Sequence, residues 1–483
     1  MPIDLLYPQK YLHATASATD RPRFHFAPPA CWMNDPNGLV WFRGRYHLFH
    51  QCNPLSPLPG RMGWGHATSL DGLHWEYQPL VLVPDGGFAE EGSDLPAGGC
   101  FTGSPIVKDD RLYLLYTNCT SDPEGSTTQL QHLAFSDDGM TFHKIPSPVI
   151  ASYPPDGSEQ FRDPKVWKHG EHWYCIIGSC RNGLGNVLLY RSDDLQNWTY
   201  IGESLRAESA QTQGWMWECP SLFSVNGVDI LMISPMGLEN QGVICAYFVG
   251  NLDYQTGRFT PRSFHSLCHS PEFYSAQVYQ VDGYDAPVLI SWMQHWVVPE
   301  YPTVKEGWNG VHSLHYLCGY DSVSDRLTLR PVPQIKTLRI KEVSLDKIES
   351  HSFEVLLSAS LPDSSTSGSL ELQLCRSEDG TEYTSISYNV SSGILTVDCS
   401  HSGKEGGNLV SSGLVGRENR TLNLQIFVDC CSIEVLAGSG THLFSHRIFP
   451  SPGSTGATLS TSNIKIQDLH VFQLDSIYNI SND

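Results

Sequence analysis

Three carboxylates stand out because they lie in segments rich in Trp, Pro and Gly. They are Asp35 in Trp32-Met-Asn-Asp-Pro-Asn-Gly38, Asp163 in Phe161-Arg-Asp-Pro-Lys165, and Glu218 in Trp215-Met-Trp-Glu-Cys-Pro220. An isolated acid among apolar and aromatic residues costs free energy unless it is hydrogen-bonded or used in chemistry. The apolar neighbours of Glu218 would favour its protonated form, as a general acid requires. Two or three carboxylates in an aromatic-lined pocket are the groups that hydrolyse glycosidic bonds.

The spacing of these acids requires the fold to bring them together. They are 128 and then 55 residues apart, so each belongs to a different structural unit. Arg162, directly before Asp163, could hold that acid ionised or bind a sugar hydroxyl. A single Asp-Pro pair is common in the turns between strands and does not by itself indicate a catalytic residue. The prediction of chemistry therefore depends on the three segments converging.

The elements available to position the acids are short β-strands. Helical periodicity is almost absent, and clusters of Gly, Pro, Asp and Asn separate the apolar and aromatic runs, which is typical of an all-β protein. Examples of these runs are 38–42, 46–49, 111–116, 172–177 and 228–233.

A loose internal repeat indicates how these strands are grouped. The pattern S-x-D-x-x-x-aromatic begins at Ser69, Ser136 and Ser192, at intervals of 67 and 56 residues. Such an interval fits one four-stranded propeller blade with long loops. Three similar hairpins in a sandwich would also explain it. About 330 residues at this period would form five or six blades.

The composition changes after about residue 335. All twelve Trp lie at or before Trp308, and the later sequence alternates apolar with polar residues, as in 369–374 and 422–428. That alternation is the pattern of a β-sandwich. We therefore predict an all-β protein with a five-bladed β-propeller over 1–335, a linker over 336–345 and a β-sandwich over 346–483. Blade starts converge on a propeller axis, which would bring the three acids into one funnel.

Charge and cysteine usage restrict the partners. Thirty Lys and Arg against 51 Asp and Glu give a net charge of −21, which argues against nucleic acid and anionic membranes and favours a neutral substrate. No apolar run of 18 residues occurs, and the first residues lack the features of a secretory signal. The fourteen scattered Cys show no zinc-site spacing and are interpreted as reduced thiols. We expect a cytoplasmic protein.

The three acid-bearing segments resemble the signature motifs of glycoside hydrolase family 32, the β-fructofuranosidases (invertases, inulinases, levanases and related fructosyltransferases). Supporting similarities run through the chain in the family's order. They are Phe49-His-Gln-Cys-Asn-Pro54, Trp64-Gly-His-Ala67, Phe101-Thr-Gly-Ser104, Glu272-Phe-Tyr274, Ser291-Trp-Met293 and, in the predicted sandwich, Ile426-Phe-Val-Asp-Cys-Cys-Ser-Ile-Glu-Val435. The resemblance covers nearly the whole chain.

The resemblance implies a role for each acid. Asp35 would be the nucleophile that attacks the anomeric carbon of a terminal β-fructofuranosyl unit, and Glu218 would protonate the leaving oxygen and then deprotonate water. Asp163 would stay ionised and bind fructose hydroxyls. Retaining chemistry of this kind places the nucleophile and the acid roughly 5–5.5 Å apart and needs no metal and no organic cofactor.

The resemblance also implies the residues around the acids. Polar side chains that would bind hydroxyls or support the acids are Asn34, Gln51, Thr102, Arg162 and Tyr274. Aromatic side chains that would form the apolar walls are Trp32, Trp64, Phe101 and Trp292. For each aromatic residue the alternative is a place in the propeller core.

Three departures from the family pattern bear on specificity. Residues 57–61 replace a stretch in which the family usually has a Trp, Ser221 stands where an Asp usually follows the third motif, and 313–317 replaces a frequent Pro-Arg-Glu. We expect these positions to lie where the leaving group or acceptor binds.

Several functions stay open at this point. The leading one is hydrolysis of sucrose or short fructo-oligosaccharides, and the same acids would serve a fructosyltransferase or an exo-acting fructan hydrolase. A non-catalytic sugar-binding propeller would be expected to lack one acid, and all three are present. A sialidase-like propeller would need an arginine cluster, which is not evident. A homo-oligomer formed through the sandwich is possible.

Overall fold

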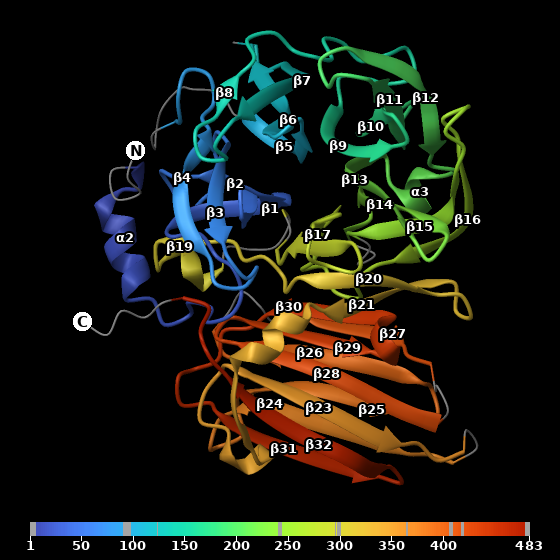
Figure 1. Cartoon of the computed structure of the whole chain (residues 1–483). Coiled ribbons are helices and arrows are strands. Elements are labelled where there is room, and N and C mark those ends of the chain that lie inside the picture. Colours follow the sequence, from blue (N-terminus) through green and yellow to red (C-terminus); the bar gives the residue numbers. More distant parts are fainter. Residues whose placement is uncertain are drawn as a thin grey trace.

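The computed structural model describes residues 6–89, 98–122, 124–239, 244–294, 296, 301–363, 366–404, 409–416 and 420–478. Five sheets surround a common axis and two further sheets lie beside them (Figure 1). The predicted fold class, a five-bladed β-propeller followed by a β-sandwich, is confirmed. Helices are short: α2 (Gln9–Ala16), α3 (Ala210–Gln213) and the 3₁₀ turns η2 (Pro302–Val304), η3 (Pro333–Leu338), η4 (Leu345–Lys347) and η6 (Gly438–Gly440). Within the described ranges no helix is long and apolar enough to cross a membrane.

Each propeller blade is an antiparallel sheet of consecutive strands. The first contains β1 (Cys31–Phe42), β2 (Arg45–Asn53), β3 (Gly63–Ser69) and β4 (Glu76–Leu82), and the second β5 (Gly99–Lys108), β6 (Arg111–Ser121), β7 (Thr127–Ser136) and β8 (His143–Lys144). The third contains β9 (Phe161–His169), β10 (His172–Arg181), β11 (Leu184–Ser192) and β12 (Trp198–Arg206). The fourth contains β13 (Met216–Val225), β14 (Val228–Met236), β15 (Ala246–Leu252) and β16 (Phe259–Ser266). The fifth contains β17 (Tyr274–Tyr279), β18 (Val288–Trp292), β20 (Tyr316–Asp321) and β21 (Arg326–Pro331).

The first strand of each blade is the innermost one. Figure 1 shows β1, β5, β9, β13 and β17 around the centre, and each of them packs against the next, with β17 returning to β1. The short strand β19 (Trp308–Asn309) closes the ring, since it pairs in parallel with the start of β1. These five strands run in the same direction, so their first halves lie at one end of the axis.

The S-x-D repeat forms the same turn in three consecutive blades. It follows β3, β7 and β11, the third strand of each blade. In the first copy Ser69 Oγ accepts from the Gly72 amide at 2.9 Å, and Asp71 Oδ1 accepts from the His74 amide at 2.9 Å. The other copies repeat these bonds through Ser136 and Ser192. The interpretation of the repeat as a blade signature is therefore confirmed.

The sandwich consists of a six-stranded and a five-stranded antiparallel sheet. The first has the order β22 (Arg339–Val343), β32 (Lys465–Leu474), β23 (Phe353–Ser360), β28 (Thr421–Asp429), β29 (Ser432–Ala437) and β30 (His442–Arg447). The second has the order β27 (Val410–Leu414), β26 (Ile394–His401), β25 (Tyr383–Asn389), β24 (Ser369–Arg376) and β31 (Gly456–Ser462). The segment 336–345, expected as a linker, contains part of η3 and the edge strand β22.

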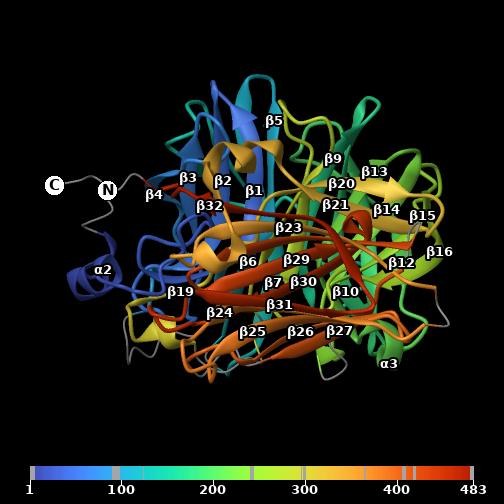
Figure 2. The ribbon, with the colours of Figure 1, turned by 90° about the horizontal axis from the view of Figure 1, so that it is seen from below.

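The sandwich lies against the side of the propeller, next to β20 and β21, and leaves the axis uncovered (Figures 1 and 2). The interface is partly apolar, since Phe427, Leu436 and Leu443 of the sandwich belong to the same buried cluster as Leu314 and Leu329 of the propeller.

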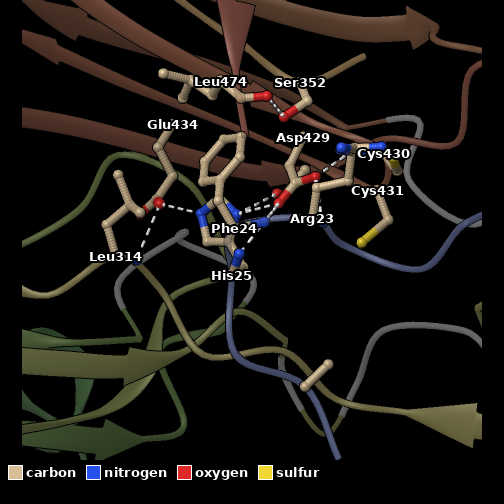
Figure 3. Close-up of polar contacts among 12 residues, drawn as sticks. Arg23, Phe24, His25, Leu314, Ser352, Asp429, Cys430, Cys431, Glu434 and Leu474 are labelled. Atoms are coloured by element: carbon tan, nitrogen blue, oxygen red, sulfur yellow. Dashed lines mark hydrogen bonds and ion pairs between the residues drawn. The ribbon is translucent and has the colours of Figure 1, made fainter. Parts of the chain in front are cut away.

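A buried charged network also crosses this interface (Figure 3). His25, just before β1, contacts Asp429 through Nδ1 at 2.9 Å and Glu434 through Nε2 at 2.7 Å. Burial alone would lower the pKa of His25, but these two hydrogen bonds outweigh it and raise the pKa to about 9. Glu434 also accepts from the Leu314 amide and the Tyr316 hydroxyl. The contact between the two parts therefore combines apolar packing with a buried charged network.

Candidate active site

All five inner strands carry a one-residue bulge at the same end of the axis. The pairing of the first strand with the second shifts by one residue at positions 101–102 of β5, 163–164 of β9, 219–220 of β13 and 275–276 of β17, and twice by one residue within positions 34–37 of β1. A bulge inserts one extra residue into a strand and redirects its side chain. The extra residues therefore turn toward the axis instead of continuing the alternation of the sheet.

One residue from each bulge contributes to a single connected cluster, which we call the bulge ring: Asp35, Thr102, Asp163, Cys219 and Ser275. Thr102 Oγ1 donates to Asp35 Oδ2 at 2.6 Å. Cys219 Sγ lies 3.6 Å from the same oxygen, 3.5 Å from Asp163 Oδ2 and 2.9 Å from Ser275 Oγ. Two acids from distant parts of the sequence thus face the same thiol.

The backbone of the bulge ring is strained. Asp163, Cys219 and Ser275 have φ values of 65°, 49° and 55°, in the left-handed region that non-glycine residues rarely adopt. Opposite the β9 bulge, a Cβ on Gly178 would lie 2.1 Å from the carbonyl oxygen of Trp217, so only glycine allows β10 to approach β13 there. Non-glycine residues keep such backbone conformations only where the surrounding structure enforces them, and these conformations are most frequent at functional sites.

Asp35 is held by one carboxylate oxygen and is free at the other. Its exposed fraction is 8%, and Oδ1 accepts no hydrogen bond from any described residue. Burial raises the pKa of Asp35 to about 6, the hydrogen bond from Thr102 opposes the rise, and the charge of Glu218 adds to it. A carboxylate with one fixed and one free oxygen is suited to attack an electrophilic carbon.

Asp163 is fixed by the backbone on both sides. Its amide donates to Thr117 Oγ1 at 3.0 Å, and its Oδ2 accepts from the Cys219 amide at 3.0 Å. Burial and then the charge of Glu218 raise the pKa of Asp163, while Arg162 opposes the rise. Since Asp163 and Asp35 share these neighbours, ionisation of one acid disfavours ionisation of the other.

Glu218 precedes the β13 bulge and contacts two polar side chains. Arg162 Nε donates to Glu218 Oε1 at 2.8 Å, and the Tyr274 hydroxyl donates to Oε2. The Arg162 guanidinium is itself fixed by Gln160 at 2.6 Å and Gln129 at 3.2 Å. The apolar surroundings expected for Glu218 are therefore incomplete, because an ion pair and a phenol hold its carboxyl group. Its side chain keeps 15% exposure, which leaves it accessible to a bound molecule.

The remaining predicted polar residues form a second group beside Asp35. Asn34 donates through Nδ2 to Gln51 Oε1, and its Oδ1 accepts from the Trp32 indole at 2.9 Å. This chain of bonds orients the backbone on which Asp35 lies. Trp32, Trp292 and Tyr274 belong to one buried apolar cluster, against which Phe101 packs. The structure thus brings together eight of the nine residues predicted around the acids.

Trp64 differs from the other predicted aromatic residues. It is completely buried within the packing between the first two blades, and its indole donates to the Phe101 carbonyl at 3.0 Å. Its contact with the site is therefore made through the backbone of the segment that carries Thr102. Trp292 is also fully buried, behind Trp32 and Trp296, whose rings lie 5.6 and 5.0 Å from it.

Two of the three departures from the family pattern lie away from the mouth of the site. Ser221 is fully buried, and its hydroxyl donates to Gln277 Oε1 at 3.0 Å, in the layer below the bulge ring. Residues 313–317 are buried beside the sandwich, where Tyr316 donates to Glu434 at 2.8 Å. The expectation that these positions contact an acceptor was wrong, because both face the interior. Leu58 and Pro59, by contrast, are exposed in the loop between β2 and β3.

Sequence reasoning missed the rest of the bulge ring and the residues behind it. Cys219 and Ser275 adjoin predicted residues, so their place in the motifs was a usable signal. Gln160 directly precedes the second motif, whereas Gln129, which also holds Arg162, lies in a segment without any motif. Burial raises the pKa of the Cys219 thiol well above its usual value, so it stays protonated and can donate to either acid.

The arrangement has the parts needed for covalent acid–base chemistry. Asp35 offers a free carboxylate oxygen, Glu218 offers an accessible carboxyl group, and Asp163 offers a fixed acceptor between them. Apolar rings on one side exclude water and strengthen charge interactions.

Comparisons with known proteins agree over the whole chain. Residues 25–331 match the glycosyl hydrolases family 32 N-terminal domain, and residues 327–473 match the glycosyl hydrolases family 32 C-terminal domain. A sucrose-6-phosphate hydrolase of Bacillus subtilis is 31% identical over 474 residues, with 94% of each chain covered. A raffinose invertase of Escherichia coli is 34% identical over 479 residues, with 93% of each covered. A Bombyx mori β-fructofuranosidase mutant solved in complex with sucrose is 30% identical with a TM-score of 0.81, covering 96% of this chain and 97% of the other.

Proposed function

The chain belongs to glycosyl hydrolases family 32, and on that premise we propose that it hydrolyses terminal β-D-fructofuranosides of neutral sugars, with sucrose or a short fructo-oligosaccharide as substrate. The observation that supports this most is the bulge ring, in which Asp35 and Asp163 are held by one thiol while Glu218 lies next to it. A retaining glycosidase needs these groups: a nucleophile, an acid/base and a fixed acceptor for sugar hydroxyls.

Asp35 acts as the nucleophile in this proposal. Its Oδ1 attacks the anomeric carbon, while Thr102 and Cys219 hold Oδ2 and take up the charge that shifts during bond formation. The bond to the leaving oxygen breaks as Glu218 transfers its proton to that oxygen. Water then attacks the fructosyl ester, gives its proton to Glu218 and releases Asp35. Atoms and protons balance over the two steps without a metal.

Arg162 and Tyr274 position the Glu218 carboxyl group in both steps, since they contact opposite oxygens. Asp163 would accept hydrogen bonds from two fructose hydroxyls, which strengthen as positive charge develops on the ring. Trp32 and Phe101 would contact the apolar face of the sugar, because both lie in the aromatic cluster beside Asp35.

The loops at the mouth support a neutral substrate. The described parts of these loops, 54–62, 83–89, 122, 124–126, 145–160, 207–215, 237–239 and 301–307, contain two Lys or Arg residues, Arg61 and Lys305, and eight Asp or Glu residues. Arg61 donates to the Asp85 carbonyl at 2.7 Å. A phosphate dianion is usually bound by several charge-assisted hydrogen bonds from Arg or Lys. A phosphorylated sugar would meet a predominantly acidic rim here.

Parallel kinetics would test the substrate. We expect kcat/KM for sucrose to exceed that for sucrose-6-phosphate by about tenfold or more, a difference of about 1.4 kcal/mol, because the acidic rim repels the phosphate. Arg61→Gln should leave the sucrose value unchanged. A higher value for the phosphorylated sugar, lost in Arg61→Gln, would contradict the proposal and assign the phosphate to Arg61.

Product analysis at high sucrose would separate hydrolysis from transfer. Equimolar glucose and fructose are expected. Excess glucose with new trisaccharides would identify a fructosyltransferase, and activity restricted to inulin-type or levan-type oligomers would identify an exo-fructanase.

We also propose an intracellular location. All fourteen cysteines are free thiols, twelve of them buried, as expected in a reducing compartment. Assembly of copies through the sandwich remains a prediction that light scattering would test.

A further inference from the structure

A buried acid at the boundary between the propeller and the sandwich lies two residues before Tyr274 in the chain. Glu272 is completely buried, in the segment 267–273 that joins β16 to β17, the innermost strand of the fifth blade. The proposed reaction assigns no role to this acid. A buried carboxyl group costs free energy unless hydrogen bonds compensate for the lost water, so its partners indicate what it holds in place.

The segment 269–272 is fixed by the edge of the sandwich. β30 is the last strand of the six-stranded sheet and lies at the boundary with the propeller (Figure 1). The His269 amide donates to the Leu443 carbonyl at 2.9 Å, and the Ser445 amide donates to Ser270 Oγ at 3.2 Å. These bonds occupy the open edge of β30, so the segment takes the place of a further strand.

Glu272 continues this edge with its side chain. Its Oε2 accepts from the Arg447 amide at 2.9 Å, two residues beyond Ser445 on β30, and His446 Nδ1 lies 3.5 Å from the same oxygen. Its Oε1 accepts from the Tyr301 hydroxyl. The Tyr301 ring in turn lies against the buried Arg447 guanidinium, 4.9 Å from the ring centroid. One carboxyl group therefore ties β30 to two separate segments of the propeller.

The chain beyond Glu272 leads directly to the acid/base. Tyr274 is the first residue of β17, and it pairs with Trp292 just before a bulge interrupts the strand. The bonds from the sandwich fix the backbone on the other side of Tyr274. Its hydroxyl donates to Glu218 Oε2, so a small displacement at Glu272 would move the phenol that orients the Glu218 carboxyl group.

We propose that Glu272 is a positioning residue through which the sandwich sets the phenol of Tyr274, and thereby the carboxyl group of Glu218. The inference rests on the proposed function, in which Glu218 is the acid/base. Because Glu272 acts through Tyr274, its loss matters only as far as proton transfer from Glu218 limits the rate. The sandwich then contributes to the rate of the reaction as well as to the stability of the propeller.

Kinetics on two leaving groups test this role. Glu272→Gln keeps the size of the side chain but replaces one acceptor oxygen with a donor, so one of its two bonds is lost. We expect kcat/KM for sucrose, whose leaving oxygen needs a proton, to fall about tenfold. For an aryl fructoside with an activated leaving group, kcat/KM should change by less than about twofold. Glu434→Gln is the matched control, since Glu434 is an equally buried acid of the same interface, and it should lower Tm and leave both kcat/KM values unchanged.

A double variant tests whether Tyr274 transmits the effect. When Tyr274→Phe is already present, Glu272→Gln should lower kcat/KM for sucrose by less than about twofold more. Tyr301→Phe is a milder second variant for the case that Glu272→Gln folds poorly. It removes one donor to Glu272, keeps the ring, and should lower kcat/KM for sucrose more than that for the aryl fructoside.

Equal losses on both substrates, an unchanged kcat/KM for sucrose in the folded variants, or a further tenfold loss in the double variant would overturn the inference. Wild-type protein that cleaved neither substrate would instead overturn the proposed function, and this inference with it.

Discussion

The two halves of the five inner strands differ in regularity and in chemistry. Beyond the bulges, pairing with the second strands is continuous, as from Gly103 to Lys108 in β5 and from Ser221 to Val225 in β13. Before that point every strand is interrupted by a bulge; the bulges of β1 and β9 hold Asp35 and Asp163, and Glu218 directly precedes the bulge of β13. The regular halves stabilise the propeller. In the bulged halves, pairing with the second strand is interrupted and the side chains of the extra residues turn toward the axis.

The bulged end has a free-energy cost that the regular end lacks. A buried Asp35 with a pKa of about 6 is ionised at pH 7, although burial favours its neutral form. The pKa of Asp35 in the folded state is higher than its unfolded value of about 3.9, so the folded state binds the proton more tightly. The free energy of unfolding therefore decreases as pH rises from about 4 to about 6. The loss is about 3 kcal/mol. Active sites commonly reduce stability in this way.

The largest effect is expected for Asp35→Asn. Without the nucleophile, kcat on sucrose should fall by about 10⁴-fold or more. Because the amide carries no charge, Tm at pH 7 should rise, and the rise should disappear near pH 4. Steady-state kinetics and calorimetry at both pH values would check this. Wild-type activity in this variant would remove Asp35 from the nucleophile role.

The next largest effect is expected for Glu218→Gln. Loss of the proton donor should lower kcat/KM for sucrose by about 10³-fold, and much less for an aryl fructoside whose leaving group needs no proton. Tyr274→Phe is the matched control, since it keeps the acid and removes only one contact. Equal losses on both substrates would contradict the acid/base assignment.

A smaller effect is expected for Thr102→Val, which removes the hydrogen bond to Asp35 Oδ2. In wild type the acid limb of kcat/KM should lie near pH 6, because Asp35 must be ionised to attack. Without the hydrogen bond the pKa of Asp35 rises further, and the limb should move up by about one pH unit. Thr102→Ser should restore it, and an unshifted limb in Thr102→Val would show that another group controls the profile.

The smallest effect on rate is expected at the interface with the sandwich, where His25 contacts Asp429 and Glu434. His25→Gln leaves a buried acid without its cation and should destabilise the protein by about 3 kcal/mol, with no change of kcat/KM below Tm. Because the folded-state pKa of His25 is raised to about 9, its contribution is complete below about pH 6.5 and lost as pH rises through 9. The wild-type and variant Tm values should therefore converge above pH 9. Residues 1–335 produced alone should be less stable than the whole chain, because Phe427, Leu436 and Leu443 of the sandwich complete a buried cluster of the propeller, and a fragment as stable as the whole chain would contradict this.

The three acids and the fold class could be predicted from the sequence because they depend on local signals. The repeat at Ser69, Ser136 and Ser192 forms a turn from nearby residues, and its hydrogen bonds can be anticipated from the residue types. The bulges could not be predicted, since register depends on strands that are distant in the sequence. The burial of Ser221 follows from that register, so it was not visible beforehand.

Mass spectrometry of a trapped intermediate would test directly whether Asp35 is the nucleophile. Glu218→Gln, mixed with an aryl fructoside and quenched in acid, should form the fructosyl ester quickly and hydrolyse it slowly. A mass increase of about 162 Da is expected on the peptide that contains Asp35. An adduct on the peptide that contains Asp163, or release of product with no adduct at any time, would contradict it.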